Sequence, residues 1–376
     1  MNRWTRTGSR LALLLAALAM VAAACSSTDD TTTTAVAAEE MTNVKVQMQW
    51  VTQAQFAGYY AALDQGYYED LGLDVELLEG SVDIVPAPVV ASGGADFGVS
   101  WVPRALAPRE EGLNVVNIAQ PFQRSATLQV SFKDAGINSV DDLAGKIVGN
   151  WGFGNELELL AGLTAAGLDK DADITLVQQN FDMLALIAGD IDAAQAMTYN
   201  EYAQVLETIN PDTGELYQPE DLSVIDWNDV GTAMLQDAIL ADGERLGDAD
   251  YRATAVSFVE ASLKGWIWCR DNQAACVDVV LAAGPTLGRS HQSWQLNEIN
   301  RLIWPSPDGI GILDLASWDN TVSVMLAGGQ ITEEPSEGAF VLDIAQEALE
   351  NLKSQGLDVV GNDWEAIEVE LLEDGN

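Results

Sequence analysis

Aromatic and amide side chains gather in one short stretch near the start of the chain, QWVTQAQFAGYY at residues 49–60. Trp50 and Tyr59 offer flat faces on which a planar ring could stack, and an offset stack contributes on the order of 1 kcal/mol beyond the area it buries. Gln55 could add amide hydrogen bonds to the edge of such a ring. The alternatives are ordinary core packing for the aromatics and a solvent-facing position for the glutamine.

The local pattern places this stretch where a strand ends and a helix begins. Val44, Val46 and Met48 alternate with polar residues, which is the period-two pattern of a half-buried strand. From Phe56 onward, apolar residues recur every three or four positions, which predicts a helix. Ligands of open α/β sheets bind where strands give way to helices, because backbone N–H groups and side chains converge there. The stretch is therefore a candidate wall of a ligand cleft.

Side chains of the same kind follow other expected strands. Trp101 and Trp151 stand at expected strand ends, Tyr199 opens a helix, and Gln120 and Phe122 follow the strand expected at residues 115–119. A planar heteroaromatic ligand would suit this set, because tryptophan adds an N–H donor to its stacking face. The alternative is that the rings fill a core and that Gln120 faces solvent.

A carboxylate and a glycine-bearing turn complete the candidate site. Glu201 follows Tyr199 and Asn200, where it could accept two N–H bonds from an amino-pyrimidine or imide-type edge, each worth about 1.5–3 kcal/mol. A helix-start glutamate favoured by the helix dipole is the alternative. The turn from Gly152 to Asn155 could offer free N–H groups to a carbonyl or hydroxyl oxygen. It lacks the spacing and the lysine of a phosphate loop, and a plain tight turn is its alternative.

The first residues are typical of an export signal. Three arginines precede an apolar run at residues 11–24, and small residues stand directly before Cys25. This pattern predicts a signal peptide at 1–24 and resembles a bacterial lipoprotein cleavage site, with Cys25 as the acylated (palmitate-bearing) first residue of the mature chain. An uncleaved anchor is the alternative. Residues 25–42 are polar and predict a flexible tether, which places the protein on the outer face of the cell membrane.

The two remaining cysteines, Cys269 and Cys276, are seven residues apart. In an exported chain they could form one local disulfide, and two buried thiols are the alternative. Because His291 is the only histidine in the chain, no metal site is expected.

The charge of the chain constrains its partners. The formal net charge is −41, and removal of residues 1–24, which hold three arginines and no acid, would leave −44. Such a surface repels nucleic acid and anionic lipid headgroups, so membrane contact is expected through the lipid anchor only. With so few lysines and arginines, the cleft is expected to lack cationic residues. A neutral or mildly polar ligand therefore fits better than a highly charged anion.

Short strands alternate with helical segments through most of the chain, which predicts mainly parallel sheets with helices on both faces. We expect an α/β clamshell of the periplasmic-binding-protein type, with two α/β lobes and a ligand cleft between them. Lobe 1 would start at 43–124, lobe 2 would span 125–230, and 231–376 would return to lobe 1 as mainly helical chain. The strand expected at 222–227 would carry the chain back.

Several motifs resemble a known family. QAQFAGYY at 53–60, GGADFGV at 93–99, DDLAGK at 141–146, WGFGNE at 151–156 and YNE at 199–201 are similar to substrate-binding proteins related to the thiamine-pyrimidine synthase family. The first and last of these motifs are the specific ones, whereas DDLAGK is shared widely among clamshell binding proteins. In related binders of pyrimidine precursors, the glutamate matching Glu201 contacts the ligand.

The resemblance implies a lipid-anchored binding protein that captures a flat heteroaromatic vitamin and delivers it to an ABC permease and its ATPase. The family includes binders of riboflavin and of formylaminopyrimidine, a thiamine precursor. The number of aromatics favours riboflavin, with the pyrimidine as the alternative. A monomer without cofactor or nucleic-acid partner is expected.

The sequence supports two other functions less well. Fungal relatives are enzymes that make the thiamine pyrimidine from a bound cofactor and their own histidine, but their cysteine-rich motif and cofactor lysine have no counterpart here. A receptor or adhesin would leave the strand-end aromatics unexplained. The candidate ligand-binding residues are therefore Trp50, Gln55, Phe56, Tyr59, Trp101, Gln120, Phe122, Trp151, Gly152, Asn155, Tyr199, Asn200 and Glu201.

Overall fold

The computed structural model describes residues 41–81 and 83–376. The predicted signal peptide, Cys25 and the tether up to residue 40 lie outside the described residues. Residues 40–376 form one compact unit, so the predicted boundaries between lobes stay predictions. No helix within the described ranges is long and apolar enough to cross a membrane.

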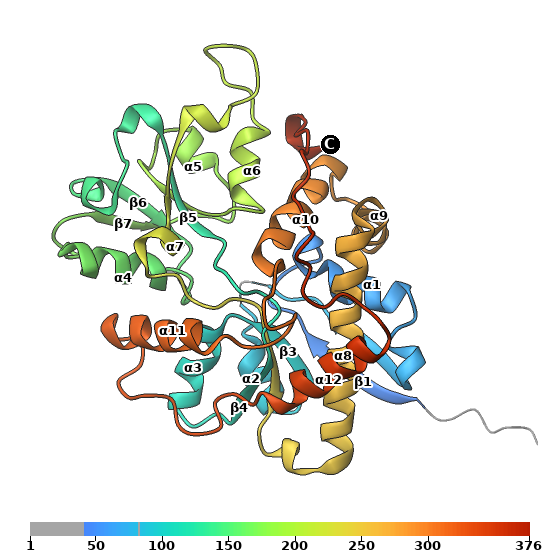
Figure 1. The fold of residues 1–376 in the computed structure, drawn as a ribbon. Helices are drawn as coiled ribbons and strands as arrows, with labels where there is room; N and C mark the ends of the chain where they lie inside the picture. The colour runs from blue at the N-terminus through green and yellow to red at the C-terminus, as the bar shows by residue number, and fades with distance from the viewer. Residues whose placement is uncertain (1–40, 82) are drawn as a thin grey trace, which may run out of the picture. The chain divides into compact units, whose positions relative to one another are not determined.

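A five-stranded sheet is built from four strands near the start of the described chain and one strand from its middle (Figure 1). Its strands, in spatial order, are β2 (Leu73–Leu78), β1 (Thr42–Gln47), β3 (Phe97–Ser100), β10 (Ala238–Asp242) and β4 (Val115–Ala119). β1 pairs in parallel with β2 and β3, whereas β10 runs antiparallel to both β3 and β4. The prediction of a mainly parallel sheet is therefore wrong for β10. This strand fills the gap between β3 and β4 as the chain returns from a separate group of strands.

Two apolar cores cover the two faces of this sheet. The helices around it are α1 (Ala57–Asp64), α2 (Pro86–Ala91), α3 (Val102–Glu110), α8 (Ala249–Asp271), α9 (Gln273–Ala283), α10 (Arg289–Ile303), α11 (Leu315–Ala327) and α12 (Asp343–Ser354). On β10, Ile239 joins the core shared with α1, α8 and α12, and Leu240 joins the core shared with α2, α3 and α11. This alternation is what a strand with helices on both faces requires.

A second group of strands lies between β4 and β10 in the sequence. β5 (Thr127–Phe132) pairs antiparallel with β8 (Ala194–Met197) and with β9 (Leu222–Asp226). β6 (Ile147–Asn150) pairs in parallel with β7 (Thr175–Gln178), and a bridge from Val148 to Ala193 joins the two small sheets. Their helices are α4 (Leu157–Ala166), α5 (Leu184–Ile187), α6 (Glu201–Leu206) and α7 (Trp227–Val230). We call the elements from β5 to α7 the second lobe and the other described elements the first lobe (Figure 1).

The expected strand at 222–227 exists as β9, but its predicted role was wrong. β9 pairs with β5 and completes the second lobe, and β10 is the strand that returns to the first. Helix α11 was also not predicted. It packs its Trp318 and Val322 in one cluster with Leu157 of α4 and Leu106 of α3, so it touches both lobes.

Several helix ends follow the capping rules read from the sequence. Asp248 accepts the backbone N–H groups of Asp250 and Tyr251 and so caps α8. Ser139 and Asp142 form a capping box on a short 3₁₀ turn. The 3₁₀ turns are η1 (Ala54–Phe56), η2 (Glu69–Leu71), η3 (Lys133–Ala135), η4 (Val140–Leu143), η5 (Pro219–Asp221), η6 (Arg245–Gly247) and η7 (Glu373–Gly375).

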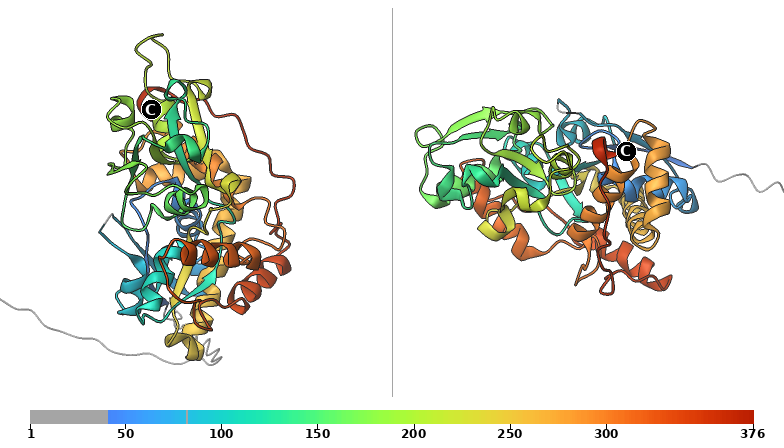
Figure 2. Two further views of the ribbon diagram at one scale, coloured as in Figure 1. Left: turned by 90° about the vertical axis from the view of Figure 1, so that its left-hand side faces the viewer. Right: turned by 90° about the horizontal axis from the view of Figure 1, so that it is seen from above.

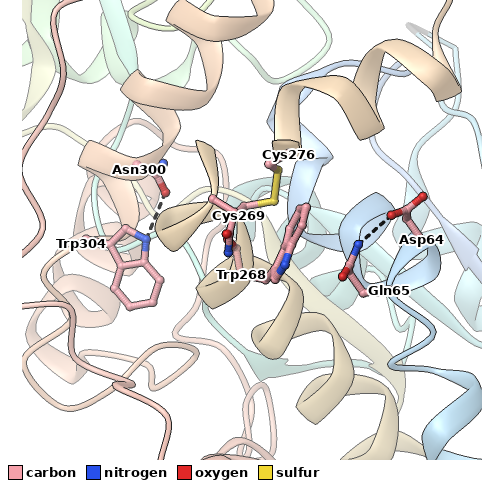
Figure 3. Close-up of a disulfide and its surroundings, with 8 residues drawn as sticks. Asp64, Gln65, Trp268, Cys269, Cys276, Asn300 and Trp304 are labelled. Atoms are coloured by element: carbon pink, nitrogen blue, oxygen red, sulfur yellow. Dashed lines mark hydrogen bonds between the residues drawn. A yellow bond between two sulfur atoms is a disulfide. The ribbon is translucent and has the colours of Figure 1, made fainter. Parts of the chain in front are cut away.

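Cys269 and Cys276 form a disulfide that joins the last turn of α8 to the first turn of α9 (Figure 3). Their Cα atoms are 5.1 Å apart, and both residues are fully buried beside Trp268. Of the two alternatives open from the sequence, the structure contains the bridge.

The last residues of the chain run from α12 alongside α10 to the second lobe, as Figures 1 and 2 both show. The N–H of Ile367 donates to the side chain of Asn297 on α10, and the N–H of Asp374 donates to the carbonyl oxygen of Glu207 at the end of α6. The C-terminal segment therefore makes a direct connection between the two lobes.

Candidate ligand-binding site

A cavity of about 490 Å³, including its part open to solvent, lies where strands of both lobes end. Its walls follow β1 and β3 in the first lobe and β6, β7 and β8 in the second. Strand ends are where the sequence pattern predicted a site. The lining residues are Gln49, Trp50, Gln53, Gln55, Trp101, Arg104, Trp151, Asn155, Phe181, Met197, Tyr199, Asn200 and Glu201.

Most of the candidate residues meet in this cavity. Those that line it are Trp50, Gln55, Trp101, Trp151, Asn155, Tyr199, Asn200 and Glu201. The structure brings together side chains that are far apart in the sequence, because each follows a strand whose end faces the same space. Their contact with a ligand remains a prediction.

Three predicted aromatics lie in the core instead. Phe56 and Tyr59 are buried with Phe122 in the large apolar cluster of the first lobe. Tyr59 packs edge-on against Trp266 at 6.1 Å, and Phe122 packs edge-on against the same ring at 6.0 Å. The helical face that carries Tyr59 is turned toward α8 and not toward the cavity. For these three residues the core-packing alternative is correct.

Gln120 also lies away from the cavity walls. Its amide nitrogen donates to the carbonyl oxygens of Phe122 and Gln236, and its amide oxygen accepts from Asn117. Gln120 is fully buried, so the solvent-facing alternative is wrong as well. It holds the loop after β4 against the segment before β10.

The turn at residues 152–155 satisfies its own hydrogen bonds. The N–H of Gly152 donates to the side chain of Asn150, and the N–H of Gly154 donates to Glu156. The carbonyl oxygen of Gly152 accepts from both the backbone and the side chain of Asn155. The prediction of free N–H groups is therefore wrong for Gly152, Gly154 and Asn155, and Gly152 acts as a turn residue with a positive φ of 71°.

Five wall residues were not among the candidates: Gln49, Gln53, Arg104, Phe181 and Met197. Phe181 follows β7, so the strand-end rule that found Trp151 applies to it too. Arg104 lies on the first turn of α3, three residues beyond Trp101 at the end of β3. Its position is close enough to a strand end to have been predicted. The expectation that the cleft lacks cationic residues is therefore wrong.

Three aromatic rings from the two lobes meet in the cavity. The ring of Phe181 lies 4.6 Å from that of Trp50, tilted by 47°, and 5.9 Å from that of Trp151, nearly parallel at 14°. Trp50 comes from the first lobe, and the other two rings come from the second. Separations of 4.5–7 Å are the normal range for stacked rings. The cavity therefore presents a continuous aromatic wall that spans both lobes.

A chain of hydrogen bonds between amide side chains connects the cavity to a buried carboxylate. Gln53 donates to the amide oxygen of Gln55 at 2.7 Å, and Gln55 donates to Asp237 at 2.8 Å. Burial raises the pKa of Asp237 to about 7, against the opposing effect of Gln55 and Trp101, which favour the charged form. The second carboxylate oxygen of Asp237 has no hydrogen-bond partner within the described residues. Asp237 also has a positive φ of 46°, a conformation that aspartate and asparagine tolerate best among larger residues.

We expect Asp237→Asn to stabilise the unliganded protein at about pH 8 by roughly 2–4 kcal/mol. Between its ordinary pKa and about 7, the folded state keeps the proton of Asp237 and the unfolded chain does not. Stability therefore falls as the pH rises through this range. Asparagine keeps the local geometry without a charge to bury. Urea unfolding at about pH 5.5 and about pH 8 should show a gain at both values, and the gain should be roughly twice as large at the higher pH.

Asp142→Asn is the control with the opposite sign. Hydrogen bonds from Asn138 and Ser139 lower the pKa of Asp142, so its contribution to stability is present at neutral pH and is lost in acid. The variant should be less stable than the wild type at about pH 8. Equal stability of Asp237→Asn and the wild type at that pH would show that Asp237 is not a buried acid.

Glu201 is buried in the wall and is tied to α10 of the first lobe. It accepts the backbone N–H of Met197 at 3.0 Å and the side-chain amide of Asn200 at 2.8 Å. Burial raises the pKa of Glu201, whereas these two donors favour its carboxylate form. The oxygen of Asn200 lies 2.8 Å from Nε2 of His291, whose Nδ1 lies 2.9 Å from Glu207. His291 thus links α10 to both ends of α6.

Among the described residues, Arg104 is the one cation of the cavity wall. It is 8% exposed, and its guanidinium makes no hydrogen bond or ion pair with any residue in the described ranges. Burial lowers the pKa of Arg104, while the charges of Asp237 and Glu156 oppose that shift. The described residues hold no cluster of three or more side chains suited to a metal ion.

Comparison with known proteins places this geometry in a family. The sequence profile of the family described as NMT1/THI5 like matches residues 53–275. A formylaminopyrimidine-binding protein from Halalkalibacterium halodurans is 27% identical over 245 residues, which cover 65% of this chain and 71% of that protein. The riboflavin-binding protein RibY from Chloroflexus aurantiacus is 26% identical over 306 residues, covering 78% of this chain and 82% of RibY.

Solved structures agree on the fold. The periplasmic sulfonate-binding protein SsuA from Methylobacillus flagellatus KT superimposes with a TM-score of 0.61 and 19% identity, covering 89% of this chain and all (100%) of that one. The chain therefore has the α/β fold of periplasmic binding proteins, as the sequence predicted.

Proposed function

Since this chain belongs to the NMT1/THI5-like family, we propose that it is the substrate-binding protein of an ABC importer and that its ligand is a flat, uncharged nitrogen heterocycle. In this proposal a lipid on Cys25 holds the protein at the outer face of the membrane, and a permease with its ATPase receives the ligand. The family and the fold support the transport role, and the leader pattern supports the anchor.

The observation that carries the proposal is the aromatic wall shared by the two lobes. Trp50 from the first lobe and Trp151 and Phe181 from the second face one cavity at stacking distances. A planar ring inserted there would contact both lobes at once, so its binding would favour the closed arrangement. Glu201 and the amide side chains of the cavity would then form hydrogen bonds with the edge of the ring.

Riboflavin is the first candidate ligand. Its three fused rings would use the whole aromatic wall, and the relative that covers the larger share of this chain is a riboflavin-binding protein. Formylaminopyrimidine is the second candidate. A specific observation favours it: Trp50 and Phe181 are already in contact, so a small ring that stacks on one face of the wall needs less rearrangement than three fused rings that would have to separate them.

An enzyme of the thiamine-pyrimidine type is less well supported. Both relatives described above are binding proteins. The single histidine of the chain, His291, is not a wall residue of the cavity, and its two ring nitrogens face Glu207 and Asn200. A mechanism that consumes a histidine would therefore find none among the described wall residues of the cavity.

Fluorescence titration of the soluble chain from residue 26 onward tests the proposal. Stacking on Trp50 and Trp151 should quench both tryptophan and flavin emission, so saturable quenching at micromolar riboflavin would support a flavin carrier. No response to riboflavin together with saturable binding of formylaminopyrimidine would assign the protein to salvage of the pyrimidine. If neither compound binds, the proposed ligand class is wrong.

A further inference from the structure

Arg104 occupies a position in the folded protein that is unfavourable for a cation. It lies in the first turn of α3, where the positive end of the helix dipole disfavours a cation. Its side chain is mostly buried, and its nitrogen atoms, which are not among the buried polar atoms without a partner, reach the cavity without bonding any described residue. The guanidinium is therefore free to donate to a molecule in the cavity.

Arg270 is a buried arginine with a structural role, and it serves as a comparison for Arg104. It has the same exposure of 8%, but it pairs with Asp271 at 2.7 Å and donates to the carbonyl oxygen of Asp358 at 2.9 Å. Its guanidinium also lies 4.5 Å from the ring of Trp304. The two arginines are equally buried, so the difference between them is the missing partner of Arg104.

The surroundings of Arg104 define the group that would satisfy it. The indole N–H of Trp151, also in the wall, has no hydrogen-bond acceptor among the described residues, whereas that of Trp101 favours the charged form of Asp237. This side of the cavity therefore presents hydrogen-bond donors, which a hydrogen-bond acceptor on a ligand would satisfy. Because the carboxylates of Asp237 and Glu156 already act on Arg104, the site does not carry the excess positive charge that an anion would need. An uncharged acceptor such as a carbonyl oxygen fits both facts.

We propose that Arg104 anchors the ligand by donating to a carbonyl-type oxygen of an uncharged ring, while Glu201 accepts an N–H from the same ring. The ligand class is then a heterocycle or its derivative with an amide-like group, in which acceptor and donor are both present. This rests on the proposed function for the identity of the ligand, but not for the role of Arg104. A guanidinium holds such an oxygen with a rigid, planar pair of donors, which an ammonium group cannot match.

Arg104→Met and Arg270→Met, measured side by side, test the role. We expect Arg104→Met to melt at or above the temperature of the wild type without ligand, because a buried and unpaired charge is removed. We expect it to bind riboflavin or formylaminopyrimidine at least about tenfold more weakly, the effect of one charge-assisted hydrogen bond. Arg270→Met should melt several degrees lower and keep the affinity of its folded fraction. Arg104→Lys should bind with intermediate affinity.

Two results would overturn the proposal. One is a loss of unliganded stability in Arg104→Met like that in Arg270→Met, since Arg104 would then be a structural residue. The other is wild-type affinity in Arg104→Met for the compound that the wild type binds. If the wild type binds neither compound, the proposed function fails, and the melting temperatures alone decide: Arg104→Met above the wild type supports the anchoring role, and below it refutes that role.

Discussion

Gly265→Ala should destabilise the folded protein by about 3 kcal/mol or more. Helices α1 and α8 cross with their backbones in contact at this residue. A Cβ atom on Gly265 would lie closer than 3.0 Å to the carbonyl oxygen of Gly58 and 3.0 Å from the backbone nitrogen of Ala62. Backbone atoms cannot rotate away as the end of a side chain can, so the helices must separate. Urea unfolding of the unliganded protein measures the effect.

Gly247→Ala is the matched control, because a Cβ atom there has open space and the residue has no positive φ. It should change stability little or raise it slightly, since alanine restricts the unfolded chain. Gly58→Ala should behave like Gly265→Ala, because its Cβ atom would enter the buried ring of Trp266. Equal stability of Gly265→Ala and Gly247→Ala would mean that the helices do not cross as closely as the structure has them.

Trp50→Ala should weaken ligand binding by roughly a hundredfold or more, which corresponds to about 3 kcal/mol of lost stacking and apolar contact. Trp50 is the aromatic ring that the first lobe contributes next to Phe181. Without it, the first lobe would lose the ring that meets Phe181 of the second, and closure of the lobes around a planar ligand would gain less. The dissociation constant for whichever of riboflavin and formylaminopyrimidine binds the wild type is the measurement.

Trp364→Ala separates this effect from a general loss of packing. Trp364 is half-buried like Trp50 and packs against the same apolar cluster, but it is not a wall residue of the cavity. Both variants should lose similar, small amounts of stability without ligand, and only Trp50→Ala should lose affinity. If both variants bind like the wild type, the aromatic wall is core and the site lies elsewhere.

Local patterns were enough to find most secondary structure. The strand expected at 115–119 is β4, and the part expected to be mainly helical from 231 onward contains α8, which Asp248 caps. Hydrophobic period and capping act within a few residues, so the sequence shows them directly. β10 was not found, although Ile239 and Leu240 are buried on its two faces. A short apolar run of this kind fits a strand or a helix, and only its pairing with β3 and β4 decides.

The direction of the strands depends on contacts between residues far apart in the sequence. β5 is antiparallel to both of its neighbours because β8 and β9 reach it after long excursions through helices. The alternation of strands and helices suggested parallel pairing throughout, but it does not fix which neighbour a strand finds. That choice depends on how the apolar faces pack together.

The strand-end rule predicted several wall residues of the cavity where it was applied. Wall residues were missed where the rule was not applied. Trp101, Trp151 and Tyr199 were found because each follows a strand. Tyr59 lies on the second turn of the expected helix, where the side that faces α8 cannot be known from the sequence. Phe181 was missed although it obeys the same rule as Trp151.

The single histidine gives this protein a natural spectroscopic label. His291 lies on α10 of the first lobe and contacts Asn200 and Glu207, the residues just before and just after α6 of the second. In an NMR spectrum its imidazole carbons and nitrogens give one set of signals that needs no assignment by mutation. Because Asn200 also bonds the wall residue Glu201, those signals sense both the separation of the lobes and the filling of the cavity. Protein purified without a histidine tag therefore carries its own reporter of closure.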